Sequence, residues 1–204
     1  MAPPGCAHPA QPCTASAAPD RTISTPADDR WREVEHADRV FTPALTDMAT
    51  RIATLLRARG ETVAVAEGSA GGLISATLLS VPGASAYYIG GAIVYTAAAG
   101  RALMAGPIEV PRGMRGATEE FARYLAQSAA AKMAATWGIG EAGAAGPANP
   151  YGDPAGHAWV AVSGPSDATR HILTGLDGRT DNMIAFAIAA LTLLVDTLES
   201  PARP

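Results

Sequence analysis

Lysine, cysteine and aromatic residues are scarce in this chain of 204 residues. Its single lysine is Lys132, beside fourteen arginines, so a catalytic lysine could only be that residue. The two cysteines, Cys6 and Cys13, fall in the Pro/Ala-rich N-terminal stretch, which excludes a disulfide framework in the core. Even with His8 nearby they are too few to build a metal centre. We therefore expect no metal ion and no cofactor.

Neither a strong charge of one sign nor a long apolar run stands out. The formal net charge is −4 at pH 7, which argues against non-specific binding to nucleic acid. No N-terminal stretch resembles a signal peptide, and no run reaches the length of a membrane span. We therefore expect a cytoplasmic protein without nucleic-acid or membrane partners. Hydrophobic residues reach 48%, and because aromatics supply only 5%, the core must consist mainly of Ala, Leu, Val and Ile.

Composition divides the chain into an N-terminal segment and one folded domain. Six prolines stand among Ala, Ser and Thr in residues 1–30, with little apolar bulk, and this predicts disorder. The charged residues that follow include a few apolar anchors that would suit a short helix. Thr42 can cap a longer helix and Pro43 fits its first turn. We predict a disordered Pro/Ala-rich segment over residues 1–41 and a folded domain over residues 42–200.

Strands and helices alternate along the folded domain. Apolar spacing and Gly/Pro punctuation define the expected elements. Helices are expected over 43–60, 71–79, 97–104, 118–136 and 181–198, and strands over 62–66, 91–95, 157–163 and 169–174. The segment 139–144 is short and ambiguous. The last two strands could form an antiparallel hairpin. This alternation predicts an α/β fold, a three-layer α/β/α sandwich with a mixed, mostly parallel sheet.

A turn of small residues, Ala66-Glu67-Gly68-Ser69-Ala70-Gly71-Gly72, joins the first strand to the second helix. Such a turn places free backbone N–H groups and a helix N-terminus at one point, where an anion or a developing oxyanion can be held. Ser69 is the only hydroxyl in the turn, and it could be a nucleophile, a phosphate ligand or a helix cap. Gly71 and Gly72 could let a ligand approach the backbone or let the helix pack closely on the sheet.

Three further segments accompany this turn. They are Pro82–Tyr88 with Gly91 and Val94–Thr96, then Gly116–Glu119, then Ala145–Pro147 with Pro154–Trp159. In this order and spacing the four segments resemble motifs of the CinA C-terminal domain family, whose first signature is A-E-S-C-T-G-G. The resemblance spans about residues 45–199. It implies the same three-layer sandwich.

Active members of that family are nicotinamide-nucleotide amidases, which hydrolyse the carboxamide of nicotinamide mononucleotide to the acid and ammonia. The resemblance implies a serine nucleophile in the first motif, a lysine base in the second and an oxyanion held by turn amides. Here the family's serine falls on Gly68 and its lysine on Gly100. Its cysteine and threonine fall on Ser69 and Ala70. Arg101, beside the lysine position, stays protonated and is a poor base.

The candidate site follows from these residues. Ser69 is the candidate catalytic residue, as a nucleophile displaced by one position. The candidate substrate-binding residues are Glu67, Gly68, Ala70, Gly71, Gly72, Tyr95, Arg101, Gly146 and Arg179. Arg101 and Arg179 are candidates for binding a phosphate. Tyr95 could stack on a pyridine ring or belong to the core, and Glu67 could bind a ribose hydroxyl or hold the turn.

Other polar residues have a structural interpretation beside a functional one. Asn149, Tyr151 and Asp153 lie in a Pro/Gly loop that would cover the site, although each could simply be solvated. His157 follows this loop and is a candidate base at neutral pH, or a structural histidine. Lys132 is expected to be a surface charge.

Two functions from different classes remain open. The first is a hydrolase, a nicotinamide-nucleotide amidase or an amidase of changed specificity that uses Ser69. The second is a non-catalytic relative that binds a nucleotide or a protein partner in the retained cleft. The expected ligand is a small-molecule nucleotide such as nicotinamide mononucleotide. A homo-oligomer is also expected, to which the apolar residues 184–198 could contribute.

Overall fold

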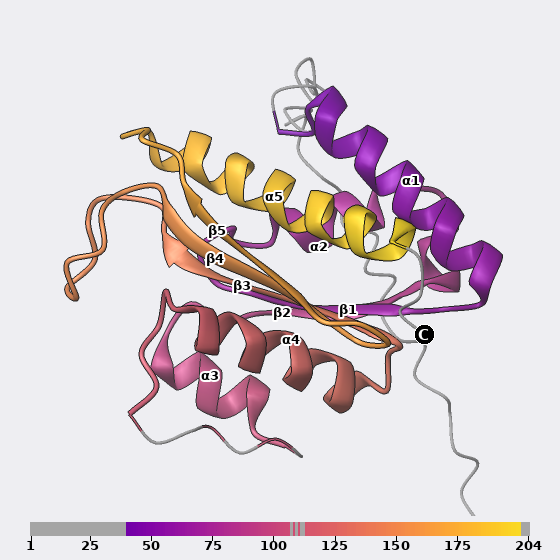
Figure 1. The fold of residues 1–204 in the computed structure, drawn as a ribbon, viewed down its shortest axis with the longest axis horizontal. Coiled ribbons are helices and arrows are strands. Elements are labelled where there is room, and N and C mark those ends of the chain that lie inside the picture. Colours follow the sequence, from indigo (N-terminus) through magenta and orange to yellow (C-terminus); the bar gives the residue numbers. More distant parts are fainter. Residues whose placement is uncertain (1–39, 107, 109, 111–112, 201–204) are drawn as a thin grey trace, which may run out of the picture. The chain divides into compact units, whose positions relative to one another are not determined.

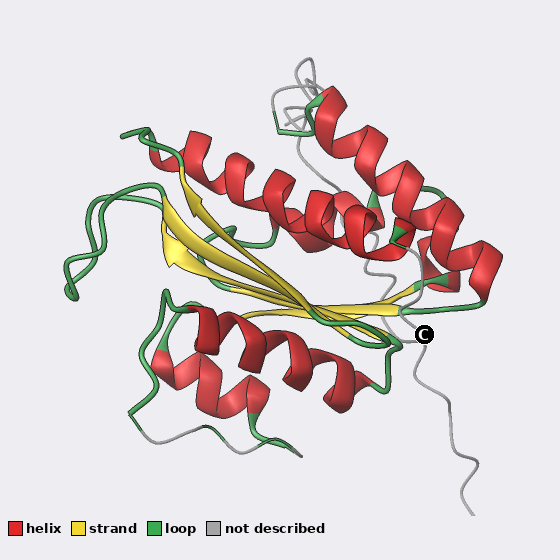
Figure 2. Ribbon diagram, viewed as in Figure 1, coloured by secondary structure: helices red, strands yellow, loops and turns green. Residues whose placement is uncertain are grey.

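The computed structural model describes residues 40–106, 108, 110 and 113–200. The predicted disorder of residues 1–41 and the short charged helix lie almost wholly outside these residues, and both stay predictions. Within the described part of the chain, a five-stranded sheet lies between two layers of helices (Figure 1). Figure 2 shows the strands of the sheet with helices on both of its faces.

The elements follow the predicted order closely. The helices are α1 (Pro43–Arg59), α2 (Leu73–Leu79), α3 (Ala97–Met104), α4 (Glu119–Met133) and α5 (Arg179–Glu199), with a 3-10 helix η3 at Ala84–Ala86. The strands are β1 (Val63–Glu67), β2 (Tyr88–Ile93), β3 (Trp137–Ala144), β4 (His157–Ser163) and β5 (Ala168–Leu173).

The sheet has the strand order β2-β1-β3-β4-β5. Strand β1 pairs in parallel with both β2 and β3, whereas β3 with β4 and β4 with β5 are antiparallel. All strands except β4 therefore run in one direction, which confirms the mixed, mostly parallel sheet. The β4–β5 hairpin is antiparallel, as the sequence suggested.

Side-chain alternation along β1 assigns the two faces of the sheet. Val63 and Val65 pack into the larger core with α1, α2 and α5, whereas Ala64 and Ala66 pack into a second core with α4. Because successive strand residues point to opposite faces, Glu67 lies on the same face as the two valines. The two helical layers thus bury both faces of the central strands (Figure 1).

Capping residues fix two of the helices where the sequence predicted. The Thr42 side chain accepts from the backbone N–H of Leu45 at the start of α1, and Gly60 ends that helix with a left-handed φ of 62°. Thr118 likewise caps α4 through the N–H of Phe121. These local signals are strong because each satisfies a backbone group that the helix leaves unpaired.

Helix α5 corrects one expectation from the sequence. By length and composition it is apolar enough to cross a membrane, although we predicted that no run reaches that length. In the structure, half of its apolar window is buried against the rest of the chain. Phe186, Leu191 and Leu194 have no exposed surface and belong to the larger core. The core helix of a folded domain can have the same composition as a membrane span, so composition alone does not distinguish the two.

The second and third strands also differ from prediction. Strand β2 was expected as a buried strand over residues 91–95, but it lies at the edge of the sheet over Tyr88–Ile93, with Ile89 and Ile93 about half exposed. The ambiguous segment 139–144 is part of β3, an almost fully buried central strand. Strand β3 carries Glu141, whose contacts change the interpretation of the turn after β1.

Candidate active site

The turn after β1 is held from within by the carboxylate of Glu67. This side chain is fully buried, and its Oε2 accepts from the backbone N–H groups of Gly72 and Ile74 at 3.0 and 3.1 Å. Its Oε1 accepts from the N–H and the hydroxyl of Ser75 at 3.0 and 2.6 Å. Glu67 therefore satisfies the orphan donors at the N-terminus of α2.

A second buried carboxylate, Glu141 on β3, occupies the other half of the turn. Its Oε2 accepts from the backbone N–H groups of Gly68 and Ala70 at 3.0 and 2.8 Å. Its Oε1 accepts a short hydrogen bond from the hydroxyl of Ser69. Glu67 and Glu141 are partners in the parallel register of β1 and β3, so the two carboxylates lie side by side on neighbouring strands.

Burial raises the pKa of Glu141 from its ordinary value of 4.5 to about 7. Removal of the carboxylate from water is the largest cause, because a charge loses solvation in the interior. The Ser69 hydroxyl and the N–H groups of Ala70 and Gly68 act in the opposite direction by donating to the charged form, and the neighbouring Glu67 raises the pKa further. Near pH 7, Glu141 therefore carries a proton in part of the molecules.

These contacts correct the expected anion site. The sequence predicted free N–H groups in this turn, ready for an external anion. In the structure, five backbone N–H groups between Gly68 and Ser75 donate to the chain's own two carboxylates. Ser69 does not cap α2, because that role belongs to Glu67. Its hydroxyl is a partner of Glu141.

A pocket of about 350 Å³ opens beside Ser69 at the carboxyl ends of β1 and β3. Its wall includes Ser69, Gly143 and Gly146, and Tyr95 and Arg179 also line it. Ligands of open α/β sheets bind outside the carboxyl ends of parallel strands, so the position of this pocket is the expected one.

Arg179 bridges two sides of the pocket. It begins α5, and its guanidinium donates to the carbonyl oxygen of Gly146 and, at 3.2 Å, to the hydroxyl of Tyr95. The guanidinium carbon also lies 5.9 Å from the centre of the Tyr95 ring. Tyr95 is 63% exposed and follows β2, so it is not a core residue. An exposed cation beside an exposed ring remains available to a ligand.

The structure brings together some of the predicted site residues and separates others. Those that line the pocket are Ser69, Tyr95, Gly146 and Arg179. Those that do not are Glu67, Gly68, Ala70, Gly71, Gly72 and Arg101. Arg101 is exposed on α3, while a Cβ at Gly71 would meet the methyl of Met183 at 2.7 Å, so close packing also accounts for that glycine.

At Gly68 and Gly100, where the resemblance would place the family's serine and lysine, there is room for a Cβ atom. A Cβ at Gly68 would lie 3.4 Å from the carbonyl oxygen of Val94, and one at Gly100 would lie 3.5 Å from a methyl of Val94. Both are ordinary contacts, and neither glycine has a left-handed backbone. The backbone at these positions therefore does not require glycine.

The loop from Gly146 to Pro154 is shaped by Asp153. Asp153 binds both terminal nitrogens of Arg115 and accepts from the amide of Asn149 at 2.7 Å. The Arg115 guanidinium lowers the pKa of Asp153 below its usual range. The guanidinium carbon of Arg115 also lies 5.3 Å from the ring centre of Tyr151, and Tyr151 lines the pocket. The loop is thus an ordered wall of the pocket.

His157 and Lys132 take structural positions. His157 Nε2 lies 2.9 Å from the carbonyl oxygen of Ala117 and donates to it, and His157 Nδ1 lies 3.0 Å from His171 Nε2. Lys132 donates to the carbonyl oxygen of Ala105 at 2.6 Å on the exposed surface, as predicted for a surface charge. Neither residue lines the pocket beside Ser69.

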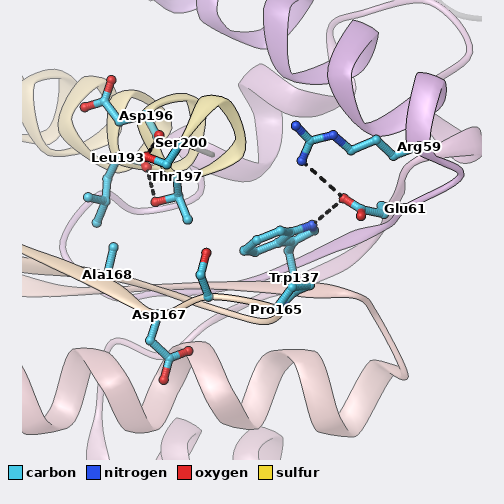
Figure 3. Close-up of a pocket in the computed structure, with 11 residues that line it drawn as sticks. Arg59, Glu61, Trp137, Pro165, Asp167, Ala168, Leu193, Asp196, Thr197 and Ser200 are labelled. Atoms are coloured by element: carbon cyan, nitrogen blue, oxygen red, sulfur yellow. Dashed lines mark hydrogen bonds and ion pairs between the residues drawn. The ribbon is translucent and has the colours of Figure 1, made fainter. Parts of the chain in front are cut away.

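A larger pocket of about 880 Å³ lies away from these motifs. It is formed where β1 and β3 begin, at the β4–β5 turn and at the end of α5 (Figure 3). Figure 3 shows Trp137 donating to Glu61, which Arg59 also approaches, and the hydrogen bond from Trp137 to Glu61 is 2.8 Å long. None of the predicted site residues lines it, so its size does not make it the candidate site.

The fold is a three-layer α/β domain with a pocket at the carboxyl ends of its parallel strands. The model of the CinA C-terminal domain matches residues 45–198. The chain therefore belongs to the CinA C-terminal domain family, as its motifs indicated.

Known relatives agree in sequence. The chain is 37% identical over 133 residues to the CinA-like protein of Anaeromyxobacter sp. (strain Fw109-5), which covers 65% of this chain and 32% of that protein. It is 35% identical over 152 residues to the CinA-like protein of Myxococcus xanthus (strain DK1622), covering 73% of this chain and 36% of that one. The matched part spans about a third of the length of these relatives.

Solved structures agree in fold. The competence/damage inducible protein CihA from Agrobacterium tumefaciens superposes with a TM-score of 0.69 at 26% identity, over 77% of this chain and 96% of that chain. A CinA superfamily protein from Escherichia coli gives 0.69 at 19% identity, over 75% and 90%, and this likeness shows the fold alone.

Sequence reasoning missed Glu141. The segment around it contains glycine and alanine at alternate positions, which obscured the strand. A signal was nevertheless present, because Glu141 is a lone charged residue between Ile139 and Ala142 in an apolar segment. A buried strand would leave such a carboxylate in need of partners.

Proposed function

We propose that this chain hydrolyses the carboxamide of a pyridine mononucleotide, as a nicotinamide-nucleotide amidase whose nucleophile is Ser69. The observation that carries the proposal is the pocket, which is lined by Ser69 together with Arg179 and Tyr95. An amidase of this class needs a nucleophile at the carboxamide and a cation for the phosphate.

The phosphate and the pyridine ring of the nucleotide each have a partner of suitable chemistry in the pocket. The guanidinium of Arg179 can pair with a phosphate in a bidentate manner. The Tyr95 ring offers a face on which a pyridine can stack. A volume of about 350 Å³ is in the range of pockets that enclose small ligands. Ser69 would then form an acyl-enzyme, release ammonia and be regenerated by water.

A second candidate function is binding of the nucleotide without hydrolysis. The saturated turn favours it, because the N–H groups of Gly68 and Ala70 already donate to Glu141 and leave no oxyanion hole there. The glycines at positions 68 and 100, where the resemblance would place a serine and a lysine, point in the same direction. Under this candidate, Arg179 and Tyr95 keep their roles and Ser69 has none in chemistry.

Ammonia release from nicotinamide mononucleotide by the purified protein separates the two candidates. The proposal predicts turnover that Ser69→Ala abolishes, with binding of the nucleotide retained in calorimetry. Binding without any release of ammonia would establish the second candidate. Turnover that survives Ser69→Ala would place the nucleophile elsewhere.

A further inference from the structure

We propose that Glu141 is the general base that takes the hydroxyl proton of Ser69, so that a serine–glutamate pair does the work of the family's serine and lysine. The inference rests on the proposed function for its amide substrate. The reactivity of the pair itself is independent of that substrate and is tested without it.

The geometry of the carboxylate suits this role. Oε2 of Glu141 is fixed by the N–H groups of Gly68 and Ala70, one on each side of Ser69 in the sequence. Oε1 is thereby directed at the Ser69 hydroxyl, which donates to it. A nucleophile in hydrogen-bond contact with an oriented base is the arrangement that activates a serine.

Burial gives the carboxylate a useful proton affinity. An ordinary glutamate is too weak a base to accept a hydroxyl proton efficiently, whereas a base with a pKa near the working pH is close to the optimum. Removal from water raises the pKa of Glu141 to about 7, and the adjacent Glu67 on β1 contributes in the same direction. The charged group that acts on Glu141 is thus another carboxylate, which strengthens it as a base.

Other bases in the described part of the chain are engaged elsewhere. His157 pairs with Ala117 and His171, and Lys132 binds Ala105 on the surface. The guanidinium of Arg179 does not lose its proton. Glu141 is the titratable side chain that contacts the Ser69 hydroxyl among the residues described.

The reaction balances with water as the only other reactant. Oγ of Ser69 bonds to the carboxamide carbon while its proton passes to Oε1 of Glu141, and the carbonyl electron pair moves to oxygen. The carbon–nitrogen bond then breaks, and the departing nitrogen takes the proton from Glu141 to leave as ammonia. Water next attacks the ester, gives its proton to Glu141 and releases the carboxylic acid. The proton on Glu141 then returns to Ser69.

A fluorophosphonate probe tests the pair directly, because such a probe phosphonylates an activated serine and releases fluoride. The label is located by peptide mass spectrometry, and its rate is followed from pH 5 to 10. We expect labelling on Ser69 with a rate that rises with pH and levels off above about pH 7, since only ionised Glu141 can accept the proton. No labelling of Ser69, or a rate that keeps rising with hydroxide to pH 10, would overturn the inference.

Variants give the second measurement. Ser69→Ala should lose the label, and Glu141→Gln should lower the labelling rate by about 100-fold, the low end for a general base. Glu120→Gln on the exposed face of α4 and Ser80→Ala at the end of α2 are matched controls and should label as the unchanged protein does. Equal rates for Glu141→Gln and the unchanged protein would overturn the inference. The pH profile of the unchanged protein decides by itself if Glu141→Gln does not fold.

The outcomes separate this inference from the proposed function. Labelling of Ser69 that depends on Glu141, without ammonia release from nicotinamide mononucleotide, would refute the substrate and retain the pair. Ammonia release that depends on Ser69, together with a labelling rate that Glu141→Gln leaves unchanged, would refute the role of Glu141 as base and retain the proposed function.

Discussion

At the scale of single residues, two buried carboxylates on neighbouring strands have different tasks. Glu67 accepts from three backbone N–H groups and one hydroxyl at the start of α2. Glu141 accepts from two backbone N–H groups and from the hydroxyl of Ser69, a residue that lines the pocket. Burial of a charge is costly unless hydrogen bonds compensate it. The turn supplies these hydrogen bonds to both carboxylates. Of the two, only Glu141 accepts a hydrogen bond from a residue that lines the pocket.

Glu141 should make folding less favourable as the pH rises. Below pH 4.5 it is protonated in the folded and the unfolded chain. Between pH 4.5 and about 7 the unfolded chain releases the proton while the folded chain keeps it, so stability falls. Glu141→Gln removes this loss, and its stability relative to the unchanged protein should rise by about 3 kcal/mol between pH 4 and 8.

Urea unfolding of both proteins across this pH range measures the difference. Glu120→Gln, on the exposed face of α4, is the control and should follow the unchanged protein. Parallel stability profiles for Glu141→Gln and the unchanged protein would show that the pKa of Glu141 is not raised by folding.

Glu67→Gln should destabilise the fold at every pH. The glutamine has one acceptor oxygen, whereas Glu67 uses both oxygens for the N–H groups of Gly72, Ile74 and Ser75. At least one buried donor would lose its partner, at a cost of about 2 kcal/mol. Urea unfolding checks this, and an unchanged midpoint would contradict the capping role of Glu67.

At the scale of elements, the contact between α4 and β3 depends on two glycines. A Cβ at Gly138 would lie 1.9 Å from the carbonyl oxygen of Ala126, and one at Gly140 would lie 2.0 Å from that of Ala122. The helix backbone therefore rests directly on the strand. Since α4 and β3 are rigid elements, the only relief for an added methyl group is separation of the two.

Gly140→Ala should cost about 3 kcal/mol or more, at the upper end for overpacked cores. Gly106→Ala is the matched control, because the nearest atoms to its Cβ lie at 3.8 Å and its backbone is not left-handed. The control should change stability by less than about 0.5 kcal/mol. Equal thermal midpoints of the two variants would contradict direct contact between α4 and β3.

The same glycines explain what sequence reasoning missed. Helices with caps at Thr42 and Thr118 were predictable, because a local pattern determines each boundary. Strand β3 was not, since Gly138 and Gly140 lower its strand propensity, and their reason, the close contact with α4, is a packing feature that no local pattern shows. The Ser69–Glu141 contact joins residues 72 positions apart and depends on that unrecognised strand. The turn was visible in the sequence, but the carboxylate that fills it was not.

At the scale of the whole molecule, the sheet gathers pocket residues from distant segments. Ser69 follows β1, Tyr95 follows β2, Gly146 follows β3 and Arg179 begins α5. Parallel strands bring their carboxyl ends to one edge, and α5 begins at that edge (Figure 1). A ligand that spans Ser69 and Arg179 would therefore tie several elements together and stabilise the fold as it binds.

The two arginines proposed from the sequence should differ in their effect on nucleotide binding. Arg179→Ala should weaken binding of nicotinamide mononucleotide by about tenfold to 100-fold, the range for a lost hydrogen bond to a charged group. Arg101→Ala should leave binding unchanged, because Arg101 does not line the pocket. Calorimetric titration measures both affinities. A larger loss of affinity for Arg101→Ala than for Arg179→Ala would show that the phosphate binds at α3 instead.

The rate of ammonia release from nicotinamide mononucleotide between pH 5 and 9 tests the proposed site most directly. The Ser69–Glu141 pair predicts a rate that rises to a plateau above about pH 7, and a loss of about 1000-fold or more in Ser69→Ala. A nucleotide that binds at Arg179 and releases no ammonia at any of these pH values would contradict it, and would leave the chain as a binding member of its family.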